Sequence, residues 1–229
     1  TKSNLNNINK NILFKEGDQL VTTELYENER ILRALPYIKD VRFLIEPDTI
    51  NENMVNILLI TQDRFSFGVT GTVNGAASAA LELYNRNIFG IGHELSTRFV
   101  GHLSKQPLMG IEAFYRINNL NGKFINCSAG YLNTYLNEGA MATLDKGFLR
   151  TSDIWGYGFS GYTYRRTYQF PEMEHSTFTD PIGFNIWGGW AGRNFQTGRA
   201  EGGSQLTLTG QFLHRRFSDR PPLPSDGVQ

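Results

Sequence analysis

Cysteine and long hydrophobic runs are what this sequence has least of. One cysteine, Cys127, stands among 229 residues, which excludes an internal disulfide and a zinc site built from cysteines. The longest unbroken aliphatic run is Ile57 to Ile60, whereas a membrane-spanning helix needs roughly 20 apolar residues. We therefore expect no transmembrane helix. The single thiol is compatible with a reducing compartment and with a disulfide-poor bacterial envelope.

Net charge is also absent, because 22 basic residues balance 22 acidic ones. Without an overall field, neither nucleic acid nor an anionic membrane surface is an expected partner. Residues 1–20 lack the charged and apolar regions of a signal peptide. The chain is therefore either a soluble protein or an internal piece of an exported one.

The common catalytic motifs are missing. No Gly-x-Ser-x-Gly elbow, Walker loop or His-Glu-x-x-His motif occurs, so hydrolase, NTPase and zinc-protease mechanisms lack their minimal residues. The four histidines, His93, His102, His175 and His214, are scattered and predict ordinary hydrogen bonding. We expect a protein that is not an enzyme and that uses no metal or cofactor.

Glycine is scarce at the start of the chain. Gly17 is the only glycine before residue 62, and the other 23 follow that point. Aromatic residues split the same way, with four before it and 25 after it. This change in composition predicts two structural units, residues 1–62 and residues 63–229.

The first unit has the pattern of two helices followed by two strands. Apolar residues at helical spacing predict a short helix over residues 5–12, with Ser3 as its N-cap. A second helix is expected over 22–35, where acidic residues come early and basic ones late. Strands are expected over 41–46 and 54–60. A two-stranded sheet is marginal alone, so we expect a further strand upstream of the first residue.

The second unit alternates apolar and polar residues with period two. The cleanest segment sets Leu206, Leu208 and Phe212 against polar neighbours, and we count eight or nine such strands, each about ten residues long. Antiparallel strands of this kind build a soluble β-sandwich or a transmembrane β-barrel. Their length, the small and charged residues on one face, and the aromatics near strand ends favour the barrel.

One segment breaks the alternation. Trp155 and Phe159 occupy odd positions, whereas Tyr162 and Tyr164 occupy even ones. A glycine between them would tolerate an extra residue in the strand, so we expect a β-bulge at Gly161.

The segment LYNRNIFGIGHEL invites comparison with a nucleotide-binding glycine loop. Such a loop requires a helix after the glycines, because helix N-terminal amides complete the anion site. A period-two strand follows instead, so we expect a tight turn between two barrel strands. The residues of this hairpin motif are Asn87, Phe89, Gly90 and Gly92, with Phe89 expected at the membrane interface.

Several stretches together resemble a known family. ILFKEGDQLVTTELYENERILRALPYIKDVRFLIEP, followed by VNILLITQDRFSFGVTG, resembles the last POTRA domain and barrel entry of the BamA/TamA-like outer-membrane family, also called bacterial surface antigen proteins. NIFGIG at 87–92 is similar to the family's Asn-Leu-Phe-Gly-x-Gly. The resemblance implies an α+β POTRA-like domain and then the N-terminal half of an antiparallel transmembrane β-barrel. It also implies a missing strand upstream and further barrel strands beyond Gln229.

Candidate site residues come from the resemblance and from the alternation. The resemblance implies a POTRA edge strand that binds an extended client segment as an added strand: Val41, Arg42, Phe43, Leu44 and Ile45. It also implies a weak lateral seam at a first barrel strand expected over 65–73: Phe65, Phe67, Gly68 and Gly71. The alternation predicts lumen-facing charges: Arg98, Glu112 and Arg116. The alternative for residues 41–45 is an ordinary edge strand protected by its charged side chains. The alternative for the seam glycines is that they only fit the curvature of the barrel.

Three functions are consistent with these features. The first is an outer-membrane protein, with its POTRA region in the periplasm, that assists insertion of outer-membrane proteins or translocation of polypeptides. Its partners would be unfolded outer-membrane or exported polypeptides, outer-membrane lipids and accessory periplasmic lipoproteins, without nucleic acid. The second is a barrel dedicated to secreting one partner or a fused passenger domain. The third is a soluble periplasmic binding protein built as a β-sandwich.

Overall fold

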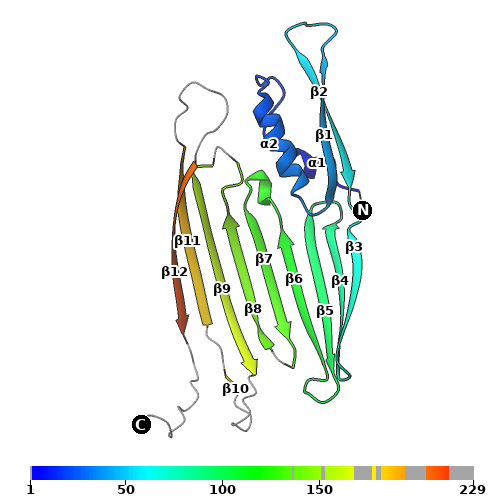
Figure 1. The fold of residues 1–229 in the computed structure, drawn as a ribbon, viewed down its shortest axis with the longest axis vertical. Helices are drawn as coiled ribbons and strands as arrows, with labels where there is room; N and C mark the ends of the chain where they lie inside the picture. The colour runs from blue at the N-terminus through cyan, green and yellow to red at the C-terminus, as the bar shows by residue number, and fades with distance from the viewer. Residues whose placement is uncertain are drawn as a thin grey trace.

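The protein consists of a small N-terminal unit of helices and strands and a large antiparallel sheet (Figure 1). The computed structural model describes residues 2–135, 137–150, 153–167, 177–178, 182–193 and 205–216. The N-terminal unit stands beyond one end of the sheet strands, so its helices leave the faces of the sheet uncovered.

The N-terminal unit packs two helices against a two-stranded antiparallel sheet. Its elements are α1 (Leu5–Asn9), α2 (Thr22–Arg33), β1 (Ile38–Pro47) and β2 (Val55–Asp63). The core is small and contains Ile8, Leu32, Tyr37, Ile38 and Val41. The expected order of helix, helix, strand, strand is therefore present. The distal part of the β1–β2 hairpin projects past α2 (Figure 1).

Ser3 does not cap the first helix, contrary to the prediction. Asn4 is the N-cap, and its side chain accepts a hydrogen bond from the Asn6 amide at 3.0 Å. Ser3 instead binds the Asp63 carboxylate through its amide at 2.8 Å and its hydroxyl at 2.7 Å. A charged acceptor makes the stronger hydrogen bond, so Ser3 joins the start of the chain to the end of β2.

The large sheet is a meander of long strands. Its elements are β3 (Phe67–Asn74), β4 (Ser78–Ile88), β5 (His93–His102), β6 (Met109–Ile117), β7 (Asn126–Asn133), β8 (Asn137–Lys146), β9 (Trp155–Thr167), β11 (Ile182–Arg193) and β12 (Gln205–Arg216). The two-residue β10 (Thr177–Phe178) pairs with β9, and a 3₁₀ turn, η1 (Leu120–Gly122), lies between β6 and β7. The nine long strands agree with the predicted eight or nine. Each long strand pairs with the next long strand along the chain, so β9 pairs with β11 and the short β10 pairs only with β9.

The large sheet is open, and does not close into a barrel, in the part of the chain that the structure describes. β3 and β12 are its two edges and do not pair with each other there. No second sheet packs against it within those residues, so the β-sandwich alternative is not the observed fold. Over the same residues, no helix is long and apolar enough to cross a membrane.

The β-bulge predicted at Gly161 is wrong. β9 pairs with β8 and with β11 through this position without any register shift. The aromatic residues change face instead, because Tyr162 lies across Gly183, where a Cβ atom would come within 2.5 Å of the Tyr162 ring. The irregularity lies in β4, between Asn85 and Ile88.

Candidate functional site

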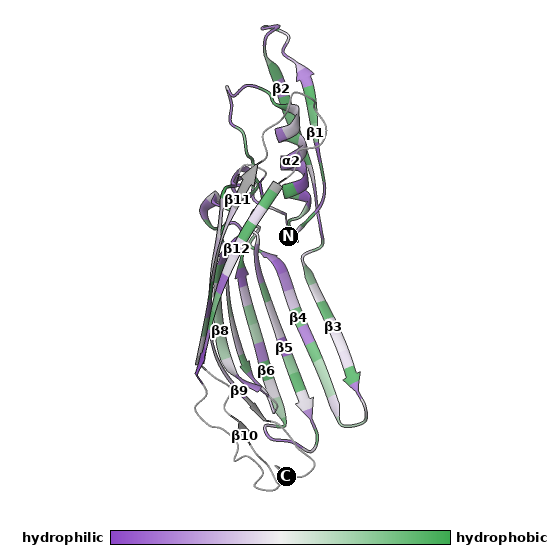
Figure 2. Ribbon diagram, turned by 60° about the vertical axis from the view of Figure 1, so that its left-hand side comes forward, coloured by the Kyte–Doolittle hydropathy of each residue, from purple (hydrophilic) through white to green (hydrophobic). Residues whose placement is uncertain are grey.

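One face of the large sheet is an exposed apolar surface. Leu144, Phe159, Ile186 and Phe212 lie in one register row across β8, β9, β11 and β12, and all are solvent-exposed. The same face continues across the earlier strands with Val69, Leu81, Leu95, Phe99, Ile111 and Tyr131. Hydrophobic and hydrophilic residues alternate along β4, β5 and β6 (Figure 2). A continuous apolar face of this extent is typical of a lipid-contacting barrel wall. We call it the apolar face.

The opposite face carries the charges predicted to face a lumen. Arg98 stands between Glu82 and Glu112 in the register, and its Nη1 lies 3.2 Å from Glu112 Oε2. Arg116 shares this face and stands opposite Glu94. Arg98 is thus one cation between two carboxylates, and its ion pair is with Glu112. Charged residues on one face of the strands are typical of a hydrated lumen.

Glycines on the polar face make room for aromatic rings. Gly68, Gly130 and Gly183 lie in one register row with Tyr84, Phe114 and Tyr162. A Cβ atom on Gly68 would lie 2.2 Å from Tyr84 Cζ. Packing against the Tyr84 ring therefore explains why position 68 is a glycine, without any need for a lateral seam. Gly71, on the apolar face, has no heavy atom within 4 Å of its Cβ position.

The seam strand begins later than predicted. β3 starts at Phe67, so Phe65 lies in the connection from β2 and is 80% exposed. The Ser66 carbonyl accepts a hydrogen bond from the Arg86 amide at 2.9 Å, and this contact extends the pairing by one residue. The far edge of β3 has no strand partner in the described residues.

The predicted client edge is open over only part of its length. The Val41 carbonyl points away from β2, because it accepts a hydrogen bond from Arg33 Nη2 at 2.9 Å. Phe43 and Ile45 follow in the same phase without a register shift, so their backbone groups also point away from β2. Arg33 therefore occupies the edge at Val41, and no other strand of the described residues pairs with it at Phe43 and Ile45. Arg42 and Leu44 bond toward β2.

The hairpin motif is where the N-terminal unit meets the sheet. Asn87 is fully buried; it donates to Ser3 Oγ at 3.0 Å and accepts from the Gly92 amide at 2.8 Å. The Asn4 amide donates to the Gly90 carbonyl at 2.8 Å. The strand end and tight turn predicted over Asn85 to Gly92 are present: β4 ends at Ile88, and Phe89, Gly90 and Gly92 have positive φ. Phe89 is 87% exposed. The motif thus holds the start of the chain as well as turning the strands.

A second contact is made by the loop between β6 and β7. Asn119 donates to the Lys10 carbonyl at 3.1 Å and to Asn11 Oδ1 at 2.8 Å, and it accepts from the Phe124 amide at 2.6 Å. Asn28 of α2 donates to the Asn11 carbonyl at 2.7 Å. These buried amides link α2 to the sheet through the segment after α1.

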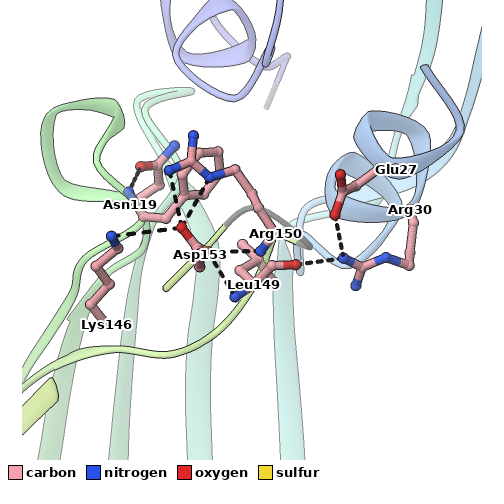
Figure 3. Close-up of polar contacts among 8 residues, drawn as sticks. Glu27, Arg30, Asn119, Lys146, Leu149, Arg150 and Asp153 are labelled. Carbon is pink, nitrogen blue, oxygen red and sulfur yellow. Dashed lines mark hydrogen bonds and ion pairs between the residues drawn. The ribbon is translucent and has the colours of Figure 1, made fainter. Parts of the chain in front are cut away.

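A third contact is made by the loop between β8 and β9 (Figure 3). Asp153 is buried there; it accepts hydrogen bonds from the Leu149 and Arg150 amides and pairs with the Arg150 and Lys146 side chains. This arrangement fixes the loop so that the Leu149 carbonyl accepts a hydrogen bond from Arg30 of α2. The N-terminal unit therefore rests on three successive loops at one end of the sheet.

Tyr37 completes the first contact from the core side. Its hydroxyl accepts a hydrogen bond from Asn7 Nδ2 at 2.9 Å. Burial raises the pKa of Tyr37 to about 12, outweighing the hydrogen bonds from Asn7 and Asn11 that lower it. The ring also lies against Gly92, where a Cβ atom would be 2.8 Å from Tyr37 Cε1.

The three histidines that the structure describes do not converge. His93 Nδ1 lies 2.6 Å from Tyr115 Oη, His102 Nδ1 accepts from the Ser104 amide at 3.1 Å, and His214 stacks on Phe184. His175 lies outside the described residues. In the part of the chain that the structure describes, no group of His, Cys, Asp and Glu side chains could hold a metal ion.

Comparison with known proteins gives a fold. No family model matches the chain, and no curated protein matches it either. The chain is similar to the crystal structure of BamA from Haemophilus ducreyi lacking POTRA domains 1-3, with a TM-score of 0.51 and 13% identity over 93% of this chain and 46% of that one. The sheet has a BamA-like fold. The chain spans about half the length of that BamA structure, and the expected resemblance is thus confirmed at the level of structure.

Four residues at these contacts were not recognised from the sequence: Asn11, Asn28, Asn119 and Asp153. The asparagines near the start of the chain were a signal, since asparagine is a poor helix former that favours caps and turns. Asn119 has a φ of 53°, a conformation that asparagine tolerates better than most residues. Their partners are distant in the sequence, so the signal alone could not identify the contacts.

Proposed function

We propose that this protein is a bacterial outer-membrane protein that assists the insertion of outer-membrane proteins or the translocation of polypeptides. The observation that carries this proposal is the apolar face of the nine-stranded sheet, together with its BamA-like fold. A sheet with one lipid-facing and one polar face spans a membrane only as part of a closed barrel. The N-terminal unit would then lie in the periplasm as a POTRA-like domain.

In this proposal, clients bind at the open part of the β1 edge. Backbone groups of Phe43 and Ile45 can pair with an extended polypeptide of almost any sequence. Exposed Leu44, Leu58 and Ile60 on the neighbouring face offer apolar contacts to its side chains. The β3 edge would supply the lateral seam of the barrel, with outer-membrane lipids and accessory periplasmic lipoproteins as further partners.

Depletion of the protein tests the proposed function in cells. Other barrel proteins should remain unassembled, or an exported polypeptide should accumulate in the periplasm. Normal assembly and secretion in a clean deletion would overturn the proposal. If a single exported protein is trapped while all barrel proteins assemble, the function is dedicated secretion.

The client edge can be tested separately with Ile45→Pro. Proline removes one outward-pointing N–H but leaves the β1–β2 ladder intact, because Ile45 does not bond toward β2. Client assembly should fall, whereas the matched control Ile45→Ala should behave as wild type. Equal assembly in both variants would show that this edge does not bind clients.

A further inference from the structure

The edge of β1 that faces away from β2 is short, because both of its ends are blocked. At one end, the Val41 carbonyl accepts a hydrogen bond from Arg33, and the Val41 amide donates one to Asp40 Oδ1 at 2.9 Å. At the other end, Pro47 closes the strand and has no N–H to donate. Two outward-pointing residues, at positions 43 and 45, lie between these ends. An added strand therefore pairs with a window of β1 that is centred on Leu44.

Three exposed side chains border this window on one face of β1: Arg42, Leu44 and Glu46. They share a face because side chains alternate along a strand. It is the face away from the helices, since Phe43 packs against the core from the other one. A residue directly opposite each of them on an added strand would lie about 4.5–5.5 Å away, measured between Cβ atoms. We call these three residues the edge strip.

The edge strip changes charge along its length. Glu46 belongs to the hairpin segment 44–60, which contains three acidic residues and no basic one. The Arg42 side chain lies 3.7 Å from Asp40 but is 72% exposed, and a guanidinium group has five N–H donors, so it can pair with a second anion. Opposite charges on facing residues stabilise a strand pair, and like charges destabilise it. The strip therefore favours a basic residue opposite Glu46, an apolar residue opposite Leu44 and an acidic residue opposite Arg42.

The direction of the added strand fixes the order of these residues. β1 already pairs antiparallel with β2, and antiparallel pairing is slightly more stable per residue than parallel pairing. In that direction, the N-terminal part of the added segment lies opposite Glu46 and its C-terminal part lies opposite Arg42. The segment then has the order basic, any residue, apolar, any residue, acidic. The reversed order would place a like charge at both ends of the strip.

A second copy of this chain has a matching strip, because Arg42, Leu44 and Glu46 complement themselves when two copies pair antiparallel. A two-fold axis relates the two strands of such a pair and is perpendicular to both. β1 runs in about the same direction as the strands of the large sheet (Figure 1), so the second sheet would point the opposite way. Two such sheets could not share one membrane, and the occupant is therefore a different polypeptide.

We propose that the β1 edge binds client segments with the pattern basic-x-apolar-x-acidic, added antiparallel to β1. This inference rests on the proposed function of the edge and adds the class of sequence that the edge selects. Backbone hydrogen bonds bind an extended segment of almost any sequence. The edge strip adds a preference among such segments and holds the preferred ones in a single register, with the apolar residue opposite Leu44.

Binding of two short peptides to the full-length protein in nanodiscs tests this preference. The probe is acetyl-Thr-Lys-Thr-Leu-Thr-Glu-Thr-amide, and the matched control exchanges its lysine and glutamate. The two peptides have the same composition and no net charge, so non-specific attraction to the protein is equal. Saturation-transfer NMR should show about 3- to 10-fold tighter binding of the probe. Equal binding, or tighter binding of the control, would overturn the proposal.

Exchanging the two charges of the edge strip locates the effect. Arg42→Glu combined with Glu46→Arg keeps the net charge of the protein, and it should reverse the preference so that the control peptide binds more tightly. The corresponding exchange outside the strip, Lys15→Glu with Glu16→Lys at two exposed positions before α2, should leave the preference unchanged. A folded strip variant that still prefers the probe would refute the assignment. If that variant does not fold, the comparison of the two peptides on the wild-type protein still decides.

The outcomes separate this inference from the proposed function. If the two peptides bind equally and Ile45→Pro weakens both, the edge binds clients without this selection, and only the inference fails. If neither peptide binds, the client edge of the proposed function fails as well. Peptide binding that weakens as the protein concentration rises would show a second copy on the edge and would also overturn the inference.

Discussion

Gly92→Ala should loosen the N-terminal unit from the sheet. An added methyl group would lie 2.8 Å from Asn7 Nδ2 and from Tyr37 Cε1, at a φ of +75°. The strained backbone costs about 1–2 kcal/mol, and overpacking adds about 1–3 kcal/mol. Partial relaxation reduces the sum, so we expect a loss of about 2–4 kcal/mol in the contact.

Hydrogen exchange measures this loss at the contact itself. The Asn4 amide donates to the Gly90 carbonyl, two residues before the mutated position, so exchange in residues 2–13 reports local opening. A loss of about 2–4 kcal/mol makes exchange roughly 30- to 1,000-fold faster. The matched control is Gly75→Ala in the β3–β4 turn, where φ is +70° and nothing lies within 4 Å. If residues 2–13 exchange no faster in Gly92→Ala than in Gly75→Ala, the close packing of Gly92 against Asn7 and Tyr37 does not hold the N-terminal unit on the sheet.

Three further predictions concern the same contacts. Asp153→Asn removes the buried carboxylate that pairs with Arg150 and Lys146. Because both cations are partly exposed and can be solvated, loop stability should fall by about 1.5–3 kcal/mol, detected as faster exchange at 146–150. Unchanged exchange there would contradict the role of Asp153. Asn119→Gly keeps the positive φ but removes three hydrogen bonds of the side chain. Residues 8–12 should therefore be cleaved faster in limited proteolysis. The control is Asn121→Gly, and equal cleavage of the two variants would contradict the prediction. Below pH 10, Tyr37 is neutral in both the folded and the unfolded state, so it adds no pH dependence to the free energy of unfolding. Folding raises the pKa of Tyr37 to about 12, so the unfolded state ionises first as pH rises from about 10 toward 12. The free energy of unfolding should therefore fall by about 2–3 kcal/mol over this range. A pH titration of unfolding should show less alkaline loss in Tyr37→Phe than in wild type, and identical pH profiles would contradict this.

The elements that could be predicted from the sequence are those fixed by local periodicity. The strands of the sheet and their two faces follow from alternation along each strand, as Leu206 and Leu208 illustrate. α2 is likewise specified locally, with Glu24 in its first turn and Arg30 and Arg33 in its last. Such signals depend on neighbours within one or two turns and therefore survive without knowledge of the fold.

The predictions were wrong or incomplete at residues whose position depends on partners far away in the sequence. Tyr162 changes face because Gly183 on another strand leaves room for its ring, and no local pattern distinguishes this from a bulge. Ser3 leaves its expected capping role for Asp63, 60 residues away, and Asn119 meets Asn11 across 108 residues. Contacts of this separation depend on how the two units dock, which the sequence pattern does not encode.

The central claim is that the apolar face contacts lipid. Fluorescence quenching along β5 tests it most directly. Single cysteines are introduced in a Cys127→Ala background, labelled with a fluorophore and reconstituted in liposomes. The fluorescence at each position is then measured with a quencher in the lipid and with a quencher in water. We predict that Leu95, Thr97 and Phe99 are quenched from the lipid and that Ser96 and Arg98 are quenched from water, because successive residues of a strand point to opposite faces. Aqueous quenching of equal strength at all five positions would contradict the claim.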